Sequence, residues 1–152
     1  MLISFGLNGS QVEADVPPGL TLLEFLRRHR QYSVKRGCDH GECGACSVLV
    51  DDQPHNACLL LMPMLKGRNV VTLEGLGADG QVHRIQERFI SEGAIQCGYC
   101  TPGMIISLAA LLRANPAPAD AEIRSTLAGN LCRCTGYVKP VAAIDRLISE
   151  KW

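Results

Sequence analysis

The sequence predicts an α+β protein in which a strand-rich half precedes a helical half. Strand patterns occur only before residue 76, and helix patterns dominate after it. The eight cysteines divide at the same place, four on each side. With 152 residues, 47% of them hydrophobic, the chain is long enough for one domain or two small ones. We therefore expect a domain over 1–76 and a second over 77–152.

The first half should open with a β-hairpin and a helix. Alternating residues at 2–7 and 11–16 flank Asn-Gly at 8–9, the dipeptide that most favours a type I′ turn. A Thr-x-x-Glu capping box then opens a pattern that predicts a helix over 21–30.

The rest of the first half reads as two further strands joined by an apolar segment. We expect strands at 47–50 and 70–73 and a short helical segment near 59–65. The glycine-rich stretch 76–80 has the composition of a linker.

The second half should contain four helices. Apolar spacing and helix stop signals predict them around 85–93, over 103–114, over 120–127 and from 140 onward. Thr101 should cap the second of these helices, with a proline at its first position. Cores this small are marginal alone, and structural metal centres are one way to stabilise them.

Charge and hydropathy exclude several classes of protein. Fifteen basic residues balance fifteen acidic ones, with a pI near 6.9, so the chain lacks the positive charge of a nucleic-acid binder or an anionic-lipid binder. No apolar run approaches the ~18 residues of a membrane span, and no secretory signal is visible. We expect protein partners and a cytoplasmic location, or a periplasmic one only if a partner carries the export signal.

A reducing cytosol disfavours disulfides, so the cysteines are expected to bind metal. The first four read C-x4-C-x2-C followed by a more distant cysteine, which is the plant-type [2Fe–2S] pattern. Neighbouring glycines would let backbone N–H groups turn toward a negatively charged cluster. Zinc prefers paired C-x2-C knuckles and fits this spacing poorly. The predicted ligands are Cys38, Cys43, Cys46 and Cys58.

The second set of cysteines is less specific. It consists of a C-x2-C pair and, after a long interval, a C-x-C pair, a spacing that leaves zinc as a serious alternative to iron. The first pair precedes a proline-started helix, whose N-terminal dipole favours a negatively charged cluster. The predicted ligands are Cys97, Cys100, Cys132 and Cys134.

Three segments carry a resemblance to a known family. Residues Gly37–Cys46, Gln96–Met104 and Gly129–Tyr137 resemble the small iron–sulfur subunit of the xanthine oxidase family of molybdenum hydroxylases. The resemblance runs in order along nearly the whole chain and includes all eight cysteines.

The resemblance implies a ferredoxin-like β-grasp domain followed by a four-helix domain, each holding one [2Fe–2S] cluster. It also implies a large partner subunit that binds a molybdenum–pterin cofactor, with Gln96 and Cys134 against the pterin. The ferredoxin-type cluster would lie farther out, toward a flavin (FAD) subunit, a cytochrome or another acceptor. The chain would then be the electron-transfer subunit of a multi-subunit oxidoreductase, with no catalytic residue of its own.

Two other functions remain open at this stage. A free-standing two-cluster ferredoxin-like carrier would leave a polar surface around the helical cluster. A zinc-stabilised interaction module would be colourless, whereas [2Fe–2S] proteins are red-brown.

Overall fold

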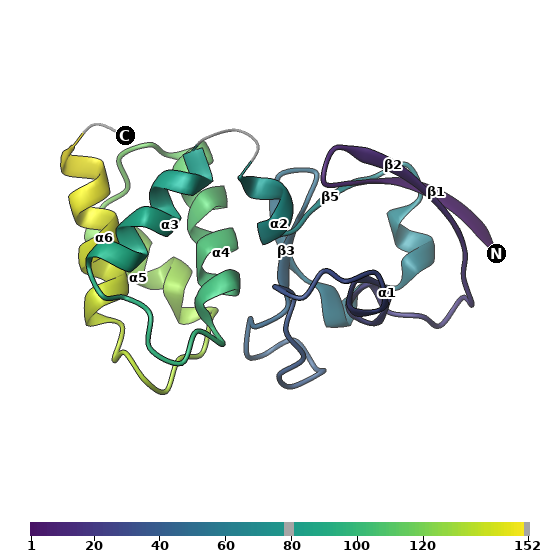
Figure 1. The fold of residues 1–152 in the computed structure, drawn as a ribbon, viewed down its shortest axis with the longest axis horizontal. Helices are drawn as coiled ribbons and strands as arrows, with labels where there is room; N and C mark the ends of the chain where they lie inside the picture. The colour runs from purple at the N-terminus through teal and green to yellow at the C-terminus, as the bar shows by residue number, and fades with distance from the viewer. Residues whose placement is uncertain (78–80, 151–152) are drawn as a thin grey trace.

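The computed structural model describes residues 1–77 and 81–150. Figure 1 shows the strand-rich half on the right and the helical half on the left, with β3, β5 and α2 between them. The expected linker at 76–80 lies partly outside the described residues. Within the described ranges, no helix has the length and apolar character needed to cross a bilayer.

The first half is built on a five-stranded mixed sheet with the strand order β2-β1-β5-β3-β4. Its β1–β5 pair is parallel and its other pairs are antiparallel. The Asn-Gly turn between β1 and β2 has both residues in the left-handed region, with φ of 51° and 80°. The strands are β1 (Leu2–Leu7), β2 (Ser10–Asp15), β3 (Ser47–Val50), β4 (Gln53–Asn56) and β5 (Asn69–Val71).

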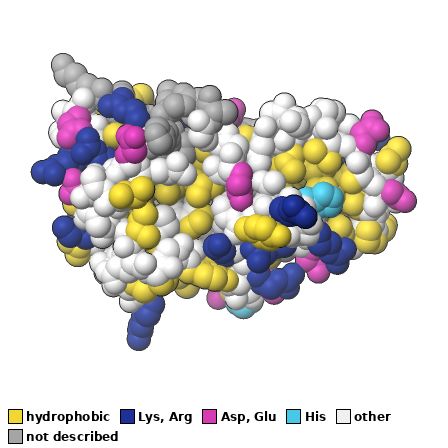
Figure 2. All heavy atoms as spheres, in the orientation of Figure 1, with side chains coloured by type: hydrophobic (Ala, Val, Ile, Leu, Met, Phe, Trp, Pro, Cys, Tyr) yellow, Lys and Arg dark blue, Asp and Glu magenta, His cyan; other side chains and the backbone are white. Residues whose placement is uncertain are grey.

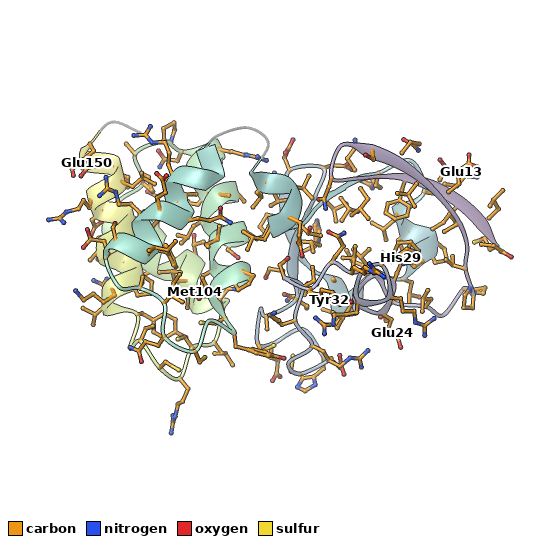
Figure 3. The ribbon with its side chains drawn as sticks, viewed as in Figure 1. Glu13, Glu24, His29, Tyr32, Met104 and Glu150 are labelled. Carbon is orange, nitrogen blue, oxygen red and sulfur yellow. The ribbon has the colours of Figure 1, made fainter. Side chains whose placement is uncertain are left out.

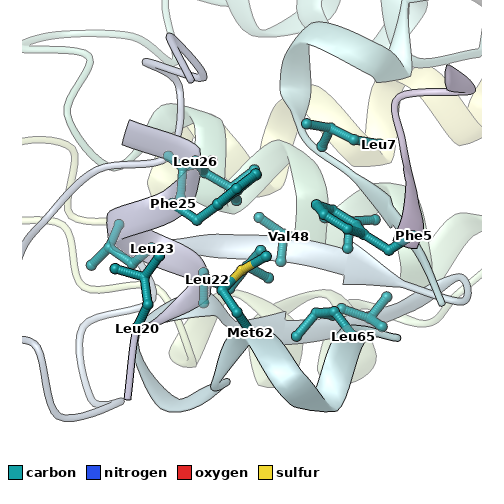
Figure 4. Close-up of a cluster of buried hydrophobic side chains, with 14 of the residues drawn as sticks. Phe5, Leu7, Leu20, Leu22, Leu23, Phe25, Leu26, Val48, Met62 and Leu65 are labelled. Carbon is teal, nitrogen blue, oxygen red and sulfur yellow. The ribbon is translucent and has the colours of Figure 1, made fainter. Parts of the chain in front are cut away.

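Helix α1 (Leu22–Arg28) packs on one face of this sheet. The predicted capping box is present: the Glu24 N–H donates to Thr21 Oγ1 at 3.2 Å, and Glu24 accepts from the Thr21 N–H at 3.3 Å. Figure 4 shows the core that α1 covers, where Phe5 of the sheet meets Phe25 of the helix edge to face. Two short 3₁₀ helices, η1 (Ala57–Leu59) and η2 (Met62–Leu65), close this core.

The described part of the second half contains the four predicted helices, and one short helix precedes them at the end of the first half. They are α2 (Leu73–Leu76), α3 (Gln81–Ser91), α4 (Thr101–Ala114), α5 (Asp120–Ala128) and α6 (Val138–Ser149). Their buried faces form a second core, and Figure 3 shows Met104 of α4 among the helices. The same view places Glu24, His29 and Tyr32 around α1.

Several predicted boundaries need correction. The last strand ends at Val71, because the residues from Leu73 onward form α2. Cys100, and not Thr101, is the N-cap of α4, since Thr101 is already helical. Helix α6 begins two residues before Pro140. The sequence analysis missed β4, whose exposed Gln-Pro-His-Asn segment carries no strand pattern; such proline-containing strands occur at sheet edges.

Strand β3 contributes to both cores. Val48 and Val50 face the first core, whereas Leu49, with no exposed surface, belongs to the core of the helical half. Helix α4 lies against β3 on that side. The two halves are therefore packed against each other through the sheet, and a domain boundary between 76 and 77 stays a prediction.

Candidate metal centres

The eight cysteines lie in loops and short turns that gather along one side of the molecule. In Figure 1 the loop between α1 and β3, the loop after α3 and the loop between α5 and α6 all lie along the lower edge. Cys58 joins the first loop from η1. The fold therefore brings each predicted quartet together from segments that are separate in sequence.

The first loop surrounds its cysteines with backbone N–H groups. Asp39 and Gly41 adopt left-handed conformations, with φ of 62° and 84°, which turn the chain around Cys38. The N–H groups of Glu42 and Cys43 each lie 3.4 Å from the Cys38 sulfur. This is the arrangement expected for a loop that stabilises thiolates with main-chain dipoles.

The electrostatics of the first quartet differ between its two ends. Hydrogen bonds from the backbone of His40 and Cys43 lower the pKa of the Cys38 thiol to about 6. Burial, together with the neighbouring Cys58 thiol, raises the pKa of the Cys46 thiol to about 12, although a hydrogen bond from the Cys58 backbone opposes the rise. One end of the site thus stabilises negative charge through N–H donors, while the other is held in an apolar surrounding.

The second site is shaped by side chains at the ends of helices. Cys100 is the N-cap of α4, and Cys132 lies in the loop that leads to α6. The Cys132 sulfur is 3.1 Å from Thr135 Oγ1 and 3.5 Å from the Thr135 N–H nitrogen. The Tyr137 hydroxyl accepts from the Cys132 N–H at 2.9 Å and donates to the Asn130 carbonyl at 3.0 Å. Sequence analysis gave Tyr137 no role beyond its place in the motif.

The pKa directions in the second quartet reveal which thiols are in contact. Burial, together with the neighbouring Cys132 thiol, raises the pKa of Cys100 to about 12. Burial also raises the pKa of Cys132, but hydrogen bonds from Thr135 outweigh burial and leave it lowered. The Cys97 thiol raises the pKa of Cys134.

The thiols therefore meet in pairs. Two cysteines that share one iron must hold their sulfurs about 4 Å apart, given tetrahedral metal–sulfur bonds of about 2.3 Å. A [2Fe–2S] cluster needs two such pairs, one for each iron, and a single zinc ion needs four thiols converging on one point. Among the described residues, no group of three or more Cys, His, Asp or Glu side chains converges in that way. The neighbouring thiols that affect each other's pKa most are Cys38–Cys43, Cys46–Cys58, Cys97–Cys134 and Cys100–Cys132. The donor set fits two two-iron clusters.

The four pairs differ in exposure. Cys46 and Cys58 are buried, whereas Cys97 and Cys134 are exposed. The remaining two pairs are half-buried. Gln96, the predicted pterin contact, is exposed beside Cys97. The structure thus gives the helical site one edge open to the surface.

The junction between the two sites was missed by sequence analysis. The Leu131 N–H donates to the Cys43 carbonyl at 2.9 Å, and the Tyr99 hydroxyl donates to the Arg36 carbonyl at 2.5 Å. Asn130 is 1% exposed and donates from Nδ2 to the Gly44 carbonyl at 2.9 Å. Its only sequence signal was membership of a motif, because the contact joins segments far apart in the chain.

Comparison with known families matches both halves. Residues 5–63 match the family described as a 2Fe-2S iron-sulfur cluster binding domain, and residues 72–145 match a [2Fe-2S] binding domain. The fold and these matches define an iron–sulfur protein with two [2Fe–2S]-binding domains.

Relatives match over nearly the full length of the chain. The nicotinate dehydrogenase small FeS subunit of Eubacterium barkeri is 46% identical, with 93% of this chain and 91% of the relative covered. The xanthine dehydrogenase iron-sulfur-binding subunit of Escherichia coli O157:H7 is also 46% identical, with 86% of this chain and 84% of the relative covered.

A solved structure agrees with the fold. Quinoline 2-oxidoreductase from Pseudomonas putida 86 superposes with a TM-score of 0.92 at 38% identity, covering 99% of this chain and 94% of that chain. The chain belongs to the family of small iron–sulfur subunits of the molybdenum hydroxylases, the xanthine oxidase family, as its motifs predict.

Proposed function

We propose that this chain is the electron-relay subunit of a molybdenum hydroxylase. It accepts electrons from the molybdenum–pterin site of a large partner subunit and passes them singly through two [2Fe–2S] clusters to a flavin subunit, a cytochrome or another acceptor. The eight cysteines are the cluster ligands, one quartet in each half. The cytoplasm is the proposed location.

The observation that carries this proposal is the surface around the exposed Cys97–Cys134 pair. Large apolar side chains next to these cysteines are exposed, with exposed fractions of 38% for Ile95, 60% for Leu131 and 69% for Val138. Figure 2 shows hydrophobic side chains along the lower edge of the helical half in this view. Exposed apolar residues are typical of protein interaction sites, and these three lie within four residues of Cys97 or Cys134 in the chain, as does the exposed Arg133.

This surface separates the proposed function from a free-standing carrier. A carrier that meets its partners only briefly would need polar groups around the cluster, as the sequence analysis noted. Large exposed apolar side chains beside two exposed ligands instead suit a lasting interface that shields the cluster from water. We propose that the large molybdenum subunit covers this rim.

The metal content of the purified chain tests the cluster assignment. We expect about four iron atoms and four acid-labile sulfides per chain, with a red-brown visible spectrum. Iron near two atoms, or stoichiometric zinc in a colourless protein, would contradict two [2Fe–2S] clusters. Capture through an affinity tag should also recover a larger chain that contains molybdenum, whereas a carrier would be recovered alone.

Gln96 provides a test of the docking direction. It is exposed beside a predicted ligand, and the family resemblance places it against the pterin. In the assembled complex, Gln96→Ala should keep the iron content and slow cluster reduction after substrate is mixed in. Gln53→Ala, on the exposed edge strand β4, is the matched control and should reduce at the normal rate. If the clusters of both variants were reduced at the normal rate, Gln96 would have no role at the interface and would only pack beside the cluster loop.

A further inference from the structure

The segment that leads into the first cysteine loop carries a large share of the chain's positive charge. Residues 27–36 contain five of the fifteen Lys and Arg residues and no Asp or Glu. The rest of the chain has ten basic residues against fifteen acidic ones, so the overall neutrality conceals a separation of charge. A cluster of one sign creates a local potential that attracts partners of the opposite sign. The basic patch consists of Arg27, Arg28, Arg30, Lys35 and Arg36.

We propose that the basic patch is the surface on which a separate, acidic redox protein docks to take electrons from the first cluster. This inference rests on the proposed relay function and names the chemistry of the acceptor at its end. In each encounter one iron of the first cluster changes from ferrous to ferric, and the redox centre of the acceptor gains that one electron. No proton or chemical group is transferred.

Most of the charge in the basic patch is not cancelled within the chain. Arg28 and Arg30 are exposed and form no hydrogen bond or ion pair with the described residues. Arg27 and Lys35 both donate to the backbone carbonyl of Tyr32, at 3.2 Å and 2.9 Å, and a neutral carbonyl leaves their charges in place. Figure 2 shows Lys and Arg side chains gathered in this region, where Figure 3 labels Tyr32.

Arg36 is the member of the basic patch that forms ion pairs with described residues. Its guanidinium lies 2.8 Å from an Asp39 carboxylate oxygen and 3.8 Å from one of Glu24. Its side chain is still half exposed. The patch therefore keeps a net positive charge when these two acidic neighbours are counted.

The backbone beneath the basic patch is held firmly in place. Arg30 adopts a left-handed conformation, with φ of 61°, in the turn that follows α1. Residues between the cations point inward: the Thr72 hydroxyl donates to Gln31 Oε1 at 2.9 Å, and the Ser33 N–H donates to Glu74 at 2.9 Å. A surface that is already ordered loses less conformational freedom when a partner binds.

An exposed aromatic side chain lies among the cations. Tyr32 is 56% exposed, and the Arg27 guanidinium lies 5.5 Å from the centre of its ring. Tyrosine and arginine are enriched among the residues that contribute most to binding in protein interfaces. The basic patch therefore combines charges that attract a partner with a flat side chain that can contact it.

The basic patch adjoins the first predicted metal site. The Lys35 N–H donates at 3.0 Å to the carbonyl of Ala45, which lies between the predicted ligands Cys43 and Cys46. Arg36 and Cys58 both line a hollow of about 190 Å³. A protein seated on the patch would therefore lie against the loop that holds the first quartet.

The two predicted metal sites are bordered by different kinds of surface. Large apolar side chains are exposed beside Cys97 and Cys134, and they suit a lasting interface. The basic patch instead offers cations and one aromatic ring. Charged surfaces of this kind speed the encounter of two proteins and give contacts that salt weakens, and complexes between redox proteins are often small. These features favour an acceptor that binds reversibly over a permanent subunit.

The first experiment compares two acceptors that differ in surface charge. The assembled complex, with its clusters reduced by substrate, is mixed with native cytochrome c or with succinylated cytochrome c, in which surface amines have become carboxylates. At low salt the succinylated protein should be reduced at least about tenfold faster. The difference should shrink as the ionic strength approaches about 0.1 M, where charges more than about 10 Å apart are screened. Calorimetry with the oxidised complex should detect binding of the succinylated protein only.

The second experiment removes two charges from the basic patch. Arg28→Gln combined with Arg30→Gln should keep the iron content and the rate at which substrate reduces the clusters, because neither side chain has a partner among the described residues. Binding and reduction of succinylated cytochrome c should both weaken by about tenfold. Lys66→Gln combined with Arg84→Gln is the matched control, since both residues are exposed and lie outside the patch. It removes the same charge and should change neither quantity.

Four outcomes would contradict these expectations. Equal reduction of the two acceptors, or equal losses in the patch and control variants, would overturn the docking surface. If the patch variant lost a subunit during gel filtration, the patch would belong to a permanent interface and reversible docking would be wrong. Sedimentation with phosphatidylserine vesicles that the patch variant abolished would assign the patch to a lipid surface instead. If substrate reduced no cluster in the unaltered complex, the relay function itself would fail.

Discussion

In the first half, three of the four predicted ligands come from one loop, whereas the second half assembles its ligands from two loops at the ends of α4 and α6. The first loop orients its N–H groups through left-handed backbone at Asp39 and Gly41. The second site relies on the side chains of Thr135 and Tyr137. A site made by backbone conformation depends on its own loop. A site made where helices end depends on how the whole half packs.

The largest expected effect comes from removing one ligand in each half. Cys43→Ser and Cys132→Ser should each lose one cluster, about two of four irons, because each quartet holds its own centre. Electron paramagnetic resonance of the reduced variants should show one signal lost and the other retained, with opposite signals lost in the two variants. Loss of both signals from a folded chain would refute separate centres.

A second comparison uses the two faces of β3. Leu49→Ala should destabilise the helical half by about 2–5 kcal/mol, because Leu49 is fully buried in that core. Val48→Ala, also fully buried, removes methyl groups from the first core instead. Urea unfolding followed by hydrogen exchange in each half should assign each loss to its own core. If both variants lowered the free energy of unfolding equally in both halves, the two halves would unfold as one cooperative unit.

A smaller effect is expected from the hydroxyl that braces the second site. Tyr137→Phe removes the hydrogen bonds to Asn130 and Cys132, a loss of about 1–3 kcal/mol confined to that loop. Iron release to a chelator should become faster from the helical cluster and stay unchanged from the other. Tyr32→Phe is the control, since the Tyr32 hydroxyl makes no hydrogen bond with the described residues. Equal release from both clusters would contradict the difference between the sites.

The smallest effect concerns the link from the first half to α2. Burial raises the pKa of Glu74, but hydrogen bonds from Ser33 and Thr72 outweigh it and hold the pKa below its ordinary 4.5. The carboxylate therefore stabilises the fold above that pH, and the contribution is lost as the pH falls below it. Because Glu74 is partly exposed, we expect less than about 1 kcal/mol. The urea midpoint should depend less on acid pH in Glu74→Gln than in the unaltered chain. If the slope of the midpoint against pH were the same in both, Glu74 would not contribute this stabilisation.

Much of the fold was predictable because its signals are local. The hairpin at Asn8, the capping box at Thr21 and the helix stop at Gly93 each lie within a few residues of the structure they specify. The plant-type loop is equally local, so its metal could be predicted from spacing. The second quartet could not be separated from zinc by spacing, since its two cysteine pairs meet only when α4, α5 and α6 pack.

The parts that sequence analysis missed all depend on distant partners. Strand β4 exists because Gln53–Asn56 pairs with β3, although its own residues carry no strand pattern. Leu49 looks like any strand residue until α4 covers it. Asn130 meets Gly44 only across the junction. No local pattern could have indicated these contacts.

The backbone hydrogen bond from the Leu131 N–H to the Cys43 carbonyl also limits which mutations position 131 can accept. Because the side chain of Leu131 is largely exposed, packing would accept many amino acids there. The N–H is supplied by every one of them except proline, and leucine codons of the CTN type become proline codons through a single base change. Folding of the isolated chain should therefore accept many residues at this position and reject one, whereas the interface with a partner subunit would add its own preference for an apolar side chain. Mutational libraries at position 131, scored for folding of the isolated chain, would then show a gap at proline alone.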